Sequence, residues 1–152
     1  MSSLESRVPP PALVLLMAVL MWLISRAAPL LHFELPAHKW LAAVLISLGF
    51  VTGMSGVITF LKAKTTVDPM KPRASSMVTW GIYARSRNPM YLGGLIMLLG
   101  WTLFLSNALA FLFLPGYVLY INRFQIAPEE RALTALFGQP YAAYQVRVRR
   151  WL

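Results

Sequence analysis

Residues 88–122 read NPMYLGGLIMLLGWTLFLSNALAFLFLPGYVLYIN, and this stretch decides the fold. No Asp, Glu, Lys or Arg lies between Arg87 and Arg123. Because a membrane-spanning helix needs about 20 mostly apolar residues, the stretch is too long for one crossing and just long enough for two short ones. Ser106-Asn107 is its one strongly polar pair. We therefore predict a tight turn there, between spans at 89–105 and 108–125.

Two further uncharged intervals lie upstream. Val8 to Ser25, entered through three consecutive prolines, predicts a span at about 11–28, and Trp40 to Leu61 predicts one at about 40–61. A cleaved signal peptide is the competing interpretation of the first interval. Its apolar run is too long for that, and Arg26 stands where small cleavage-site residues are expected. We interpret it as a permanent helix.

The expected fold class is all-α. The intervals predict a polytopic membrane helix bundle with about four transmembrane helices, plus short cytoplasmic C-terminal helices. One domain would cover 1–152, with a cytoplasmic tail at 128–152.

Composition supports lipid as the solvent. Of the 152 residues, 58% are hydrophobic and 12% are charged, whereas soluble domains carry about a quarter charged residues. The net charge of +9 would suggest nucleic acid in a soluble protein. Here cationic loops that contact anionic lipid head groups explain it, so membrane lipids are the expected partners and nucleic acid is not. The sequence has no cysteine, which excludes disulfides, thiol nucleophiles and cysteine-based zinc sites.

Lys and Arg are distributed unequally between the two sides of the predicted bundle. If the N-terminus is inside, the N-terminal segment, the loop 62–87 and the tail hold 12 of the 14 basic residues, which leaves Arg26 and Lys39 outside. The positive-inside rule then places both termini in the cytoplasm.

The first of three polar clusters on that side is Arg87-Asn88-Pro89-Met90-Tyr91, where the loop becomes the third span. Asn is a favoured N-cap and Pro a favoured first helical residue, so this cluster can simply start a helix. Capping does not explain Tyr91. The free N–H groups of a helix start also suit a bound carboxylate or phosphate.

Glycines follow that cluster and recur in the second span. Gly93-Gly94 would let either a flat ligand or a neighbouring helix approach the backbone, and packing is the more frequent reason for such glycines. Gly49, Gly53 and Gly56 have near-helical spacing and predict close helix packing in the second span.

The second cluster is Pro128-Glu129-Glu130-Arg131. Pro followed by two acids is typical of a helix start, where the helix dipole favours carboxylates. Alternatively, one of these carboxylates could hold the ammonium group of a ligand.

The third cluster is the tail, in which Gly138 and Pro140 predict the end of a helix over 129–137 and the start of another. In the second helix Tyr141, Tyr144 and Val148 would share one face. A basic helix rich in aromatic residues is commonly interfacial. That interpretation explains Arg149 and Trp151 better than it explains Tyr141, Tyr144 and Arg147.

Other catalytic signatures are absent from the sequence. His32 and His38 lie in the loop assigned outside, with Glu34 as their only acidic neighbour, so we expect no metal site. There is no phosphate-binding glycine loop, nucleophile elbow or metal-binding histidine pair.

Together the clusters resemble the isoprenylcysteine carboxyl methyltransferase family and its membrane phospholipid methyltransferase relatives. The resemblance runs from Thr65 to the C-terminus, somewhat over half of the chain. Each short piece is unspecific alone, but their order across a hydrophobic hairpin is fairly specific. The matching residues are Thr66, Pro69, Val78 to Tyr83, Ser86 to Gly93, Glu129-Glu130, Leu133, Phe137-Gly138, Tyr141, Tyr144 and Arg147.

The resemblance implies S-adenosylmethionine as cofactor, bound between the last spans and the tail. The family's Arg-His-Pro-x-Tyr and Glu-Glu elements carry over to Arg87, Asn88, Pro89, Tyr91, Glu129 and Glu130, with Leu92 alongside. This chain departs from the family at Asn88, where His is usual. Asn can form hydrogen bonds but cannot change its charge near neutral pH, so proton transfer at this position is in doubt.

The resemblance also suggests roles for individual residues. Glu130, or alternatively Glu129, would take the amino group of the methionyl part, and the helix start at 88–91 would take its carboxylate. Tyr141 and Tyr144 would enclose the cofactor, since aromatic faces stabilise cations. Arg147 would orient an acidic acceptor, which makes Arg147 and Glu130 the candidate catalytic residues.

The chemistry favours a carboxylate acceptor. A carboxylate is deprotonated at neutral pH and needs no general base, whereas an amine must first lose a proton. The expected activity is therefore methylation of a lipid-linked or small amphiphilic acceptor that enters from the bilayer. The alternatives are a phospholipid amine N-methyltransferase and a non-enzymatic membrane protein with a basic lipid-binding face. The sequence leaves the acceptor and the oligomeric state open.

Overall fold

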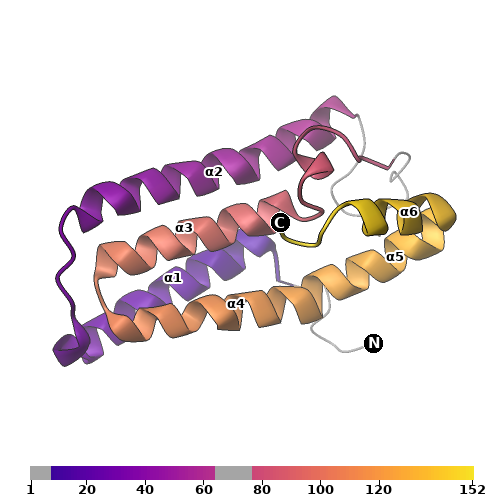
Figure 1. Ribbon diagram of the computed structural model, residues 1–152. Helices are drawn as coiled ribbons and strands as arrows, with labels where there is room; N and C mark the ends of the chain where they lie inside the picture. The colour runs from indigo at the N-terminus through magenta and orange to yellow at the C-terminus, as the bar shows by residue number, and fades with distance from the viewer. Residues whose placement is uncertain (1–7, 64–76) are drawn as a thin grey trace.

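The computed structural model describes residues 8–63 and 77–152, so Thr66 and Pro69 of the family resemblance lie outside the described residues. These described ranges form helices and no named strand (Figure 1). The all-α prediction is therefore confirmed. The helices are α1 (Pro10–Ala27), α2 (His38–Lys62), α3 (Pro89–Leu105), α4 (Phe113–Ile121), α5 (Ala127–Phe137) and α6 (Gln139–Arg147).

The first three predicted spans correspond to α1, α2 and α3 within two residues, whereas the fourth, predicted at 108–125, continues as a helix to Phe137. In the described part of the chain, three apolar helices are long enough to cross a membrane, namely Pro10–Ala27, His38–Lys62 and the continuous stretch Ala108–Phe137. The helix α3 is shorter, with 17 residues, and would extend over about 26 Å of the roughly 30 Å hydrocarbon layer. Side by side, the four segments form a polytopic membrane bundle.

The contact between α2 and α3 is made by glycines, as predicted. A Cβ added at Gly93 would lie 2.5 Å from the carbonyl oxygen of Gly49 and 2.6 Å from the backbone nitrogen of Gly53. A Cβ at Gly56 would lie 2.8 Å from Cγ of Met90. The two backbones therefore approach each other at distances that no larger residue allows. Close helix packing, and not ligand access, accounts for Gly93.

On its other side α3 packs against α1 and α4. The buried core there includes Met21, Leu98, Tyr117 and Ile121, each at most 1% exposed. Trp101 donates a hydrogen bond from Nε1 to the carbonyl oxygen of Ala18, at 2.9 Å. Thus α3 is the central helix, with α2 on one side and α1 and α4 on the other.

The predicted tight turn at Ser106-Asn107 is confirmed. Ser106 ends α3 in a left-handed conformation, with φ at +50°. The Asn107 side chain is fully buried and both donates and accepts a hydrogen bond. Its Nδ2 donates to the carbonyl oxygen of Ala28 at 2.8 Å, and its Oδ1 accepts from the Leu109 N–H at 3.0 Å. The turn is therefore tied to the end of α1.

The helix start predicted at Pro128 is wrong. The segment from Phe113 to Phe137 is one uninterrupted helical rod in which α4 passes into α5 through a π-helical turn over Asn122–Ile126 (Figure 1). Proline has no N–H to donate, and its ring collides with the carbonyl four residues earlier in a regular α-helix. The wider π turn accommodates this. Glu129 and Glu130 therefore lie inside a continuous helix and not at a free helix N-terminus.

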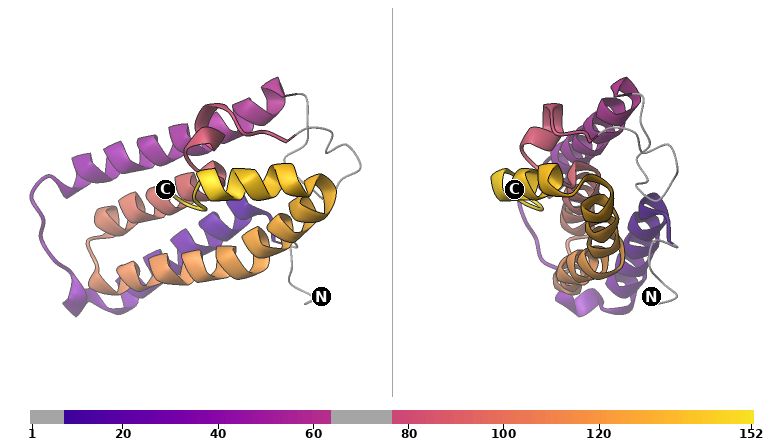
Figure 2. Two further views of the ribbon diagram at one scale, coloured as in Figure 1. Left: turned by 45° about the vertical axis from the view of Figure 1, so that its right-hand side comes forward. Right: turned by 90° about the vertical axis from the view of Figure 1, so that its right-hand side faces the viewer.

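The tail follows its prediction. The helix α5 ends at Phe137, Gly138 reverses the chain with φ at +56°, and α6 begins at Gln139. Tyr141, Tyr144 and Val148 share a buried face, which Met77, Leu133 and Phe137 contact. Figure 2 shows α6 folded back beside α5, so that the C-terminus returns to the start of α3.

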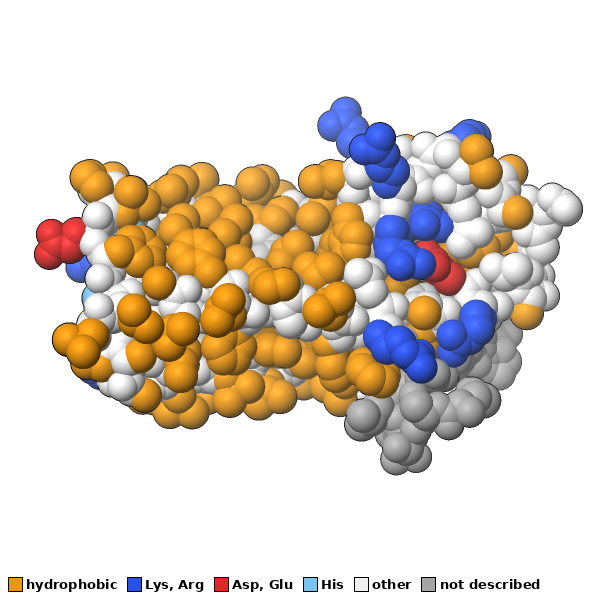
Figure 3. All heavy atoms as spheres, turned by 60° about the horizontal axis from the view of Figure 1, so that its bottom comes forward, with side chains coloured by type: hydrophobic (Ala, Val, Ile, Leu, Met, Phe, Trp, Pro, Cys, Tyr) orange, Lys and Arg blue, Asp and Glu red, His pale blue; other side chains and the backbone are white. Residues whose placement is uncertain are grey.

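Side chains of different kinds are separated along the bundle. A hydrophobic band covers its middle, and Lys and Arg gather at the end formed by α5 and α6 (Figure 3). We call this the basic end. The basic residues of the segments that meet there are Lys62, Arg85, Arg87, Arg123, Arg131, Arg147, Arg149 and Arg150.

Candidate functional site

At the basic end, the residues just before α3 pair with the C-terminal segment of the chain. The Arg87 N–H donates to the carbonyl oxygen of Arg149 at 3.0 Å. Asn88 lies at the predicted N-cap position, but its side chain makes no cap hydrogen bond. Instead its Nδ2 donates to the carbonyl oxygen of Arg150 at 2.9 Å. Asn88 thus fastens the tail to the helix start. The predicted helix start at Asn88-Pro89 is confirmed, although the Asn88 side chain makes no cap hydrogen bond.

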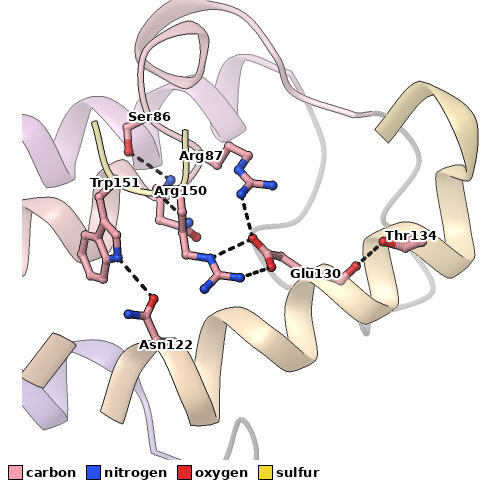
Figure 4. Close-up of polar contacts among 8 residues, drawn as sticks. Ser86, Arg87, Asn122, Glu130, Thr134, Arg150 and Trp151 are labelled. Carbon is pink, nitrogen blue, oxygen red and sulfur yellow. Dashed lines mark hydrogen bonds and ion pairs between the residues drawn. The ribbon is translucent and has the colours of Figure 1, made fainter. Parts of the chain in front are cut away.

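Glu130 is held between two guanidinium groups (Figure 4). Arg150 donates to both carboxylate oxygens, at 3.2 Å and 2.5 Å, and Nη2 of Arg87 lies 3.3 Å from Oε1. The Glu130 side chain is only 16% exposed. The hydrogen bonds to Glu130 raise the pKa of Arg150. One carboxylate therefore ties α5, the start of α3 and the tail together.

The same close-up shows a second tether of the tail. Nε1 of Trp151 donates to Oδ1 of Asn122, a residue of the π-helical turn, at 3.2 Å (Figure 4). The tail is therefore fixed on both sides of Arg150. This arrangement keeps its guanidinium group on Glu130.

Glu129 faces the start of α3. The Tyr91 hydroxyl donates to Oε1 of Glu129 at 2.5 Å, a short charge-assisted hydrogen bond. Tyr91 is 6% exposed, and its backbone carbonyl accepts from the Tyr117 hydroxyl at 3.2 Å. Two elements far apart in the sequence, Tyr91 and the adjacent acids 129–130, therefore meet at one place, as a shared site requires.

The tyrosines of α6 complete this region. Tyr141 and Tyr144 are 3% and 4% exposed, with ring centroids 6.1 Å apart. Burial raises the pKa of Tyr141, and the nearby Glu130 carboxylate adds to the increase. Burial likewise raises the pKa of Tyr144. Both phenols therefore stay neutral near pH 7. The Tyr144 hydroxyl donates to the carbonyl oxygen of Tyr83 at 2.7 Å.

Some buried donors of this region have no hydrogen-bond partner among the described residues. They are Nε and Nη1 of Arg87 and the hydroxyl of Tyr83. Buried polar atoms are nearly always paired with protein, water or ligand, so these donors are available to a ligand or an ordered water. An open groove of about 550 Å³ runs along α5 and includes Glu130, the partner of Arg87; it is lined by Ala127, Glu130, Arg131, Thr134, Ala135 and Gln145. Its volume is within the roughly 300–1,000 Å³ of ordinary ligand pockets.

The remaining predicted site residues occupy two kinds of position. Pro89 and Leu92 are buried within the bundle, and a Cβ on Gly56 would lie 3.3 Å from Cγ of Pro89, so Pro89 faces α2. Arg147 ends α6 and is exposed.

Two residues of the site were missed by the sequence analysis. Arg150 was assigned no role, since a basic residue near a chain end carries no signal of its partner. Tyr83 was noted only as part of the family resemblance.

Four helical segments, an apolar middle and a polar cluster at one end define a polytopic membrane protein with a candidate site at its basic end. The family model described as "Phospholipid methyltransferase" matches residues 37–140. The chain therefore belongs to the phospholipid methyltransferase family, and the resemblance seen in its sequence is confirmed. The matched range contains Arg87, Asn88, Tyr91 and the two acids of α5.

A relative from Haemophilus influenzae, described as an uncharacterized protein, is 52% identical to this chain over 63 residues. The match covers 41% of this chain and 100% of the relative. The family membership identifies the chain as a membrane methyltransferase.

Proposed function

We propose that this protein transfers a methyl group from S-adenosylmethionine to a lipid-linked or small amphiphilic acceptor, at the basic end of the bundle. One observation carries the proposal: Arg87 has two buried N–H donors without a partner, next to the carboxylates of α5. The methionyl part of the cofactor has one carboxylate and one ammonium group. A guanidinium group beside paired acids is complementary to both.

The residues at this end fit the cofactor. Arg87 and the start of α3 would hold the carboxylate, and Glu130, or alternatively Glu129, would hold the ammonium group. Tyr91 would keep Glu129 oriented through its hydrogen bond. The neutral rings of Tyr141 and Tyr144 would enclose the sulfonium. When bound, the cofactor supplies an electrophilic methyl group, whose C–S bond breaks as an acceptor lone pair forms the new bond.

The site favours a carboxylate acceptor over an amine. Among the described residues of the basic end, both carboxylates are held by donors, Glu129 by Tyr91 and Glu130 by Arg87 and Arg150. Each of these carboxylates is therefore already engaged by a neighbouring donor. A carboxylate acceptor needs no base, because it is already deprotonated at neutral pH. Arg147, at the exposed end of α6, would orient that acidic acceptor.

An amine of a phospholipid head group is the second candidate acceptor. The description of the family favours it. In that reaction Glu129 is the residue that would have to accept the amine proton. Replacing Glu129 with Gln should then abolish transfer to the amine, while transfer to a carboxylate should continue at a reduced rate.

The proposal includes an orientation. The basic end should face the cytoplasm, where the water-soluble cofactor is available and where the positive-inside rule places it. The acceptor, held in the bilayer, would enter sideways between the helices.

Isothermal titration of the detergent-purified protein with S-adenosylmethionine tests the proposal. We expect binding, weakened about tenfold in Arg87→Lys and in Tyr91→Phe, a loss of about 1.4 kcal/mol. Tyr120→Phe is the control, because Tyr120 lies in α4 against Phe124 and outside the site. No binding by the wild-type protein, or equal binding by all variants, would refute the proposal.

A further inference from the structure

Tyr83 carries a buried hydroxyl that the roles assigned above leave unused. The residue is 5% exposed, and its hydroxyl has no hydrogen-bond partner among the described residues. Leaving such a group unpaired costs about 1–3 kcal/mol. A phenylalanine would fill the same space without that cost. The hydroxyl is therefore explained better by a ligand than by the stability of the fold.

The two ends of Tyr83 face different parts of the molecule. Its backbone carbonyl accepts the Tyr144 hydroxyl of α6, on the side of the proposed cofactor site. Its ring packs edge-on against Phe60 of α2, with centroids 5.1 Å apart. A Cβ on Gly56 would lie 3.3 Å from the Tyr83 hydroxyl oxygen. The hydroxyl oxygen thus lies against a membrane-spanning helix, with Tyr144 of α6 and Glu129 of α5 also in its neighbourhood.

This position beside α2 suits the second of the two substrates. The cofactor is water-soluble and would meet α5, α6 and the tail. A lipid-anchored acceptor would come from the bilayer and meet the α2 side first. Glycine at position 56 brings the α2 backbone close to the hydroxyl. The Met90 side chain next to Gly56 is half-buried and flexible, so it would move to admit the acceptor.

We infer that the Tyr83 hydroxyl binds the methyl acceptor, by donating a hydrogen bond to a head-group oxygen that is not itself methylated. The inference rests on the proposed function and adds to it the residue that holds the second substrate. A donor on the attacking atom would lower its nucleophilicity, so the bonded oxygen is a neighbouring one. An ester carbonyl, a phosphate oxygen or the second oxygen of a carboxylate has the required chemistry.

The protonation state of Tyr83 agrees with a donor role. Burial raises the pKa of Tyr83, and the nearby Tyr144 and Glu129 raise it further. At neutral pH the phenol therefore keeps its proton. It can donate a hydrogen bond, and it cannot act as a base.

Thermal unfolding tests whether the hydroxyl has a structural role. We expect Tyr83→Phe to be at least as stable as the wild-type protein in detergent, because the hydroxyl has no partner to lose. Tyr144→Phe is the matched comparison, since its hydroxyl does have a partner, and it should unfold at a lower temperature. A melting temperature of Tyr83→Phe that falls as far as that of Tyr144→Phe would overturn the inference.

Methyl transfer tests the binding role. The probe is a total lipid extract of bacterial membranes, incubated with methyl-labelled S-adenosylmethionine. For Tyr83→Phe, the extract concentration at half-maximal labelling should rise about 3- to 10-fold, the range of one neutral hydrogen bond. The dissociation constant of the cofactor should stay within about twofold of wild type, and the control Tyr120→Phe should change neither quantity.

The failures of the two proposals are distinguishable. An unchanged half-maximal concentration in Tyr83→Phe, with an active wild-type protein, overturns the role of Tyr83 alone. A weakened cofactor affinity in Tyr83→Phe overturns it too, because the hydroxyl would then belong to the cofactor site. A wild-type protein that labels no lipid refutes the proposed function, and the inference with it.

Discussion

Replacing Gly93 with Ala should push α2 and α3 apart. The added Cβ would lie 2.5 Å from the carbonyl oxygen of Gly49, and ordinary contact begins at 3.4 Å. The backbones must therefore move apart by about 0.9 Å along that line. Overpacking of a tight contact costs about 1–3 kcal/mol. The cost should lie near 3 kcal/mol, about the upper end of that range, because the added Cβ meets backbone atoms. The better helix propensity of Ala stabilises the variant by up to about 1 kcal/mol. The expected net loss is about 2 kcal/mol.

Equilibrium unfolding in mixed detergent micelles, followed by circular dichroism, measures this loss. Gly116→Ala in α4 is the matched control, because a Cβ at Gly116 meets nothing within 4 Å. That variant should be unchanged or up to about 1 kcal/mol more stable. A free energy of unfolding for Gly93→Ala that equals or exceeds that of Gly116→Ala would refute the glycine contact between α2 and α3.

Three further predictions concern the basic end. Glu130→Gln should lower the free energy of unfolding by about 1–3 kcal/mol, because it leaves Arg87 and Arg150 with unpaired donors; equal stability of the variant in chemical denaturation would contradict this. Asn88→Ala removes the hydrogen bond to the carbonyl oxygen of Arg150, so limited proteolysis should cut the tail faster than in the wild-type protein. Asn88→Asp also lacks the amide donor, and its tail should be cut as fast as that of Asn88→Ala. Since the pKa of Tyr83 is raised, folding favours its neutral form, and stability should fall above about pH 10, by up to about 1.4 kcal/mol per pH unit for this group. Above about pH 10 the melting temperature of Tyr83→Phe should fall less steeply with pH than that of the wild-type protein. Equal slopes would contradict the raised pKa of Tyr83.

The spans were predictable because the bilayer imposes one simple rule on the sequence. Charges and prolines mark where a helix can leave the hydrocarbon, so α3 was predicted with the bounds it has, 89–105. The turn at Ser106-Asn107 followed from the same rule. The rule does not extend beyond the membrane, and this is why the helix across Pro128 was missed. Whether a proline starts a helix or is absorbed by a π turn depends on what the flanking residues contact.

The site was predictable as a set of residues but not as a set of contacts. Arg87, Tyr91, Glu129 and Glu130 could be selected from their motifs and spacing. Their partners could not, since Arg150 reaches Glu130 across 20 positions and Asn88 reaches the tail across 62. Contacts of this kind depend on how the tail folds back. The unpaired hydroxyl of Tyr83 is likewise visible only when its surroundings are known.

The central claim is that this membrane protein methylates a lipid-linked or amphiphilic acceptor with S-adenosylmethionine. Its most direct test is mass spectrometry of a membrane lipid extract after incubation with the purified protein and S-adenosylmethionine carrying a deuterated methyl group. The account predicts a lipid whose mass increases by one labelled methyl group and whose appearance depends on the protein. Its labelling should be slower in Arg87→Lys when the cofactor is below saturation. An extract without any labelled lipid, from a protein that is folded and binds the cofactor, would contradict it.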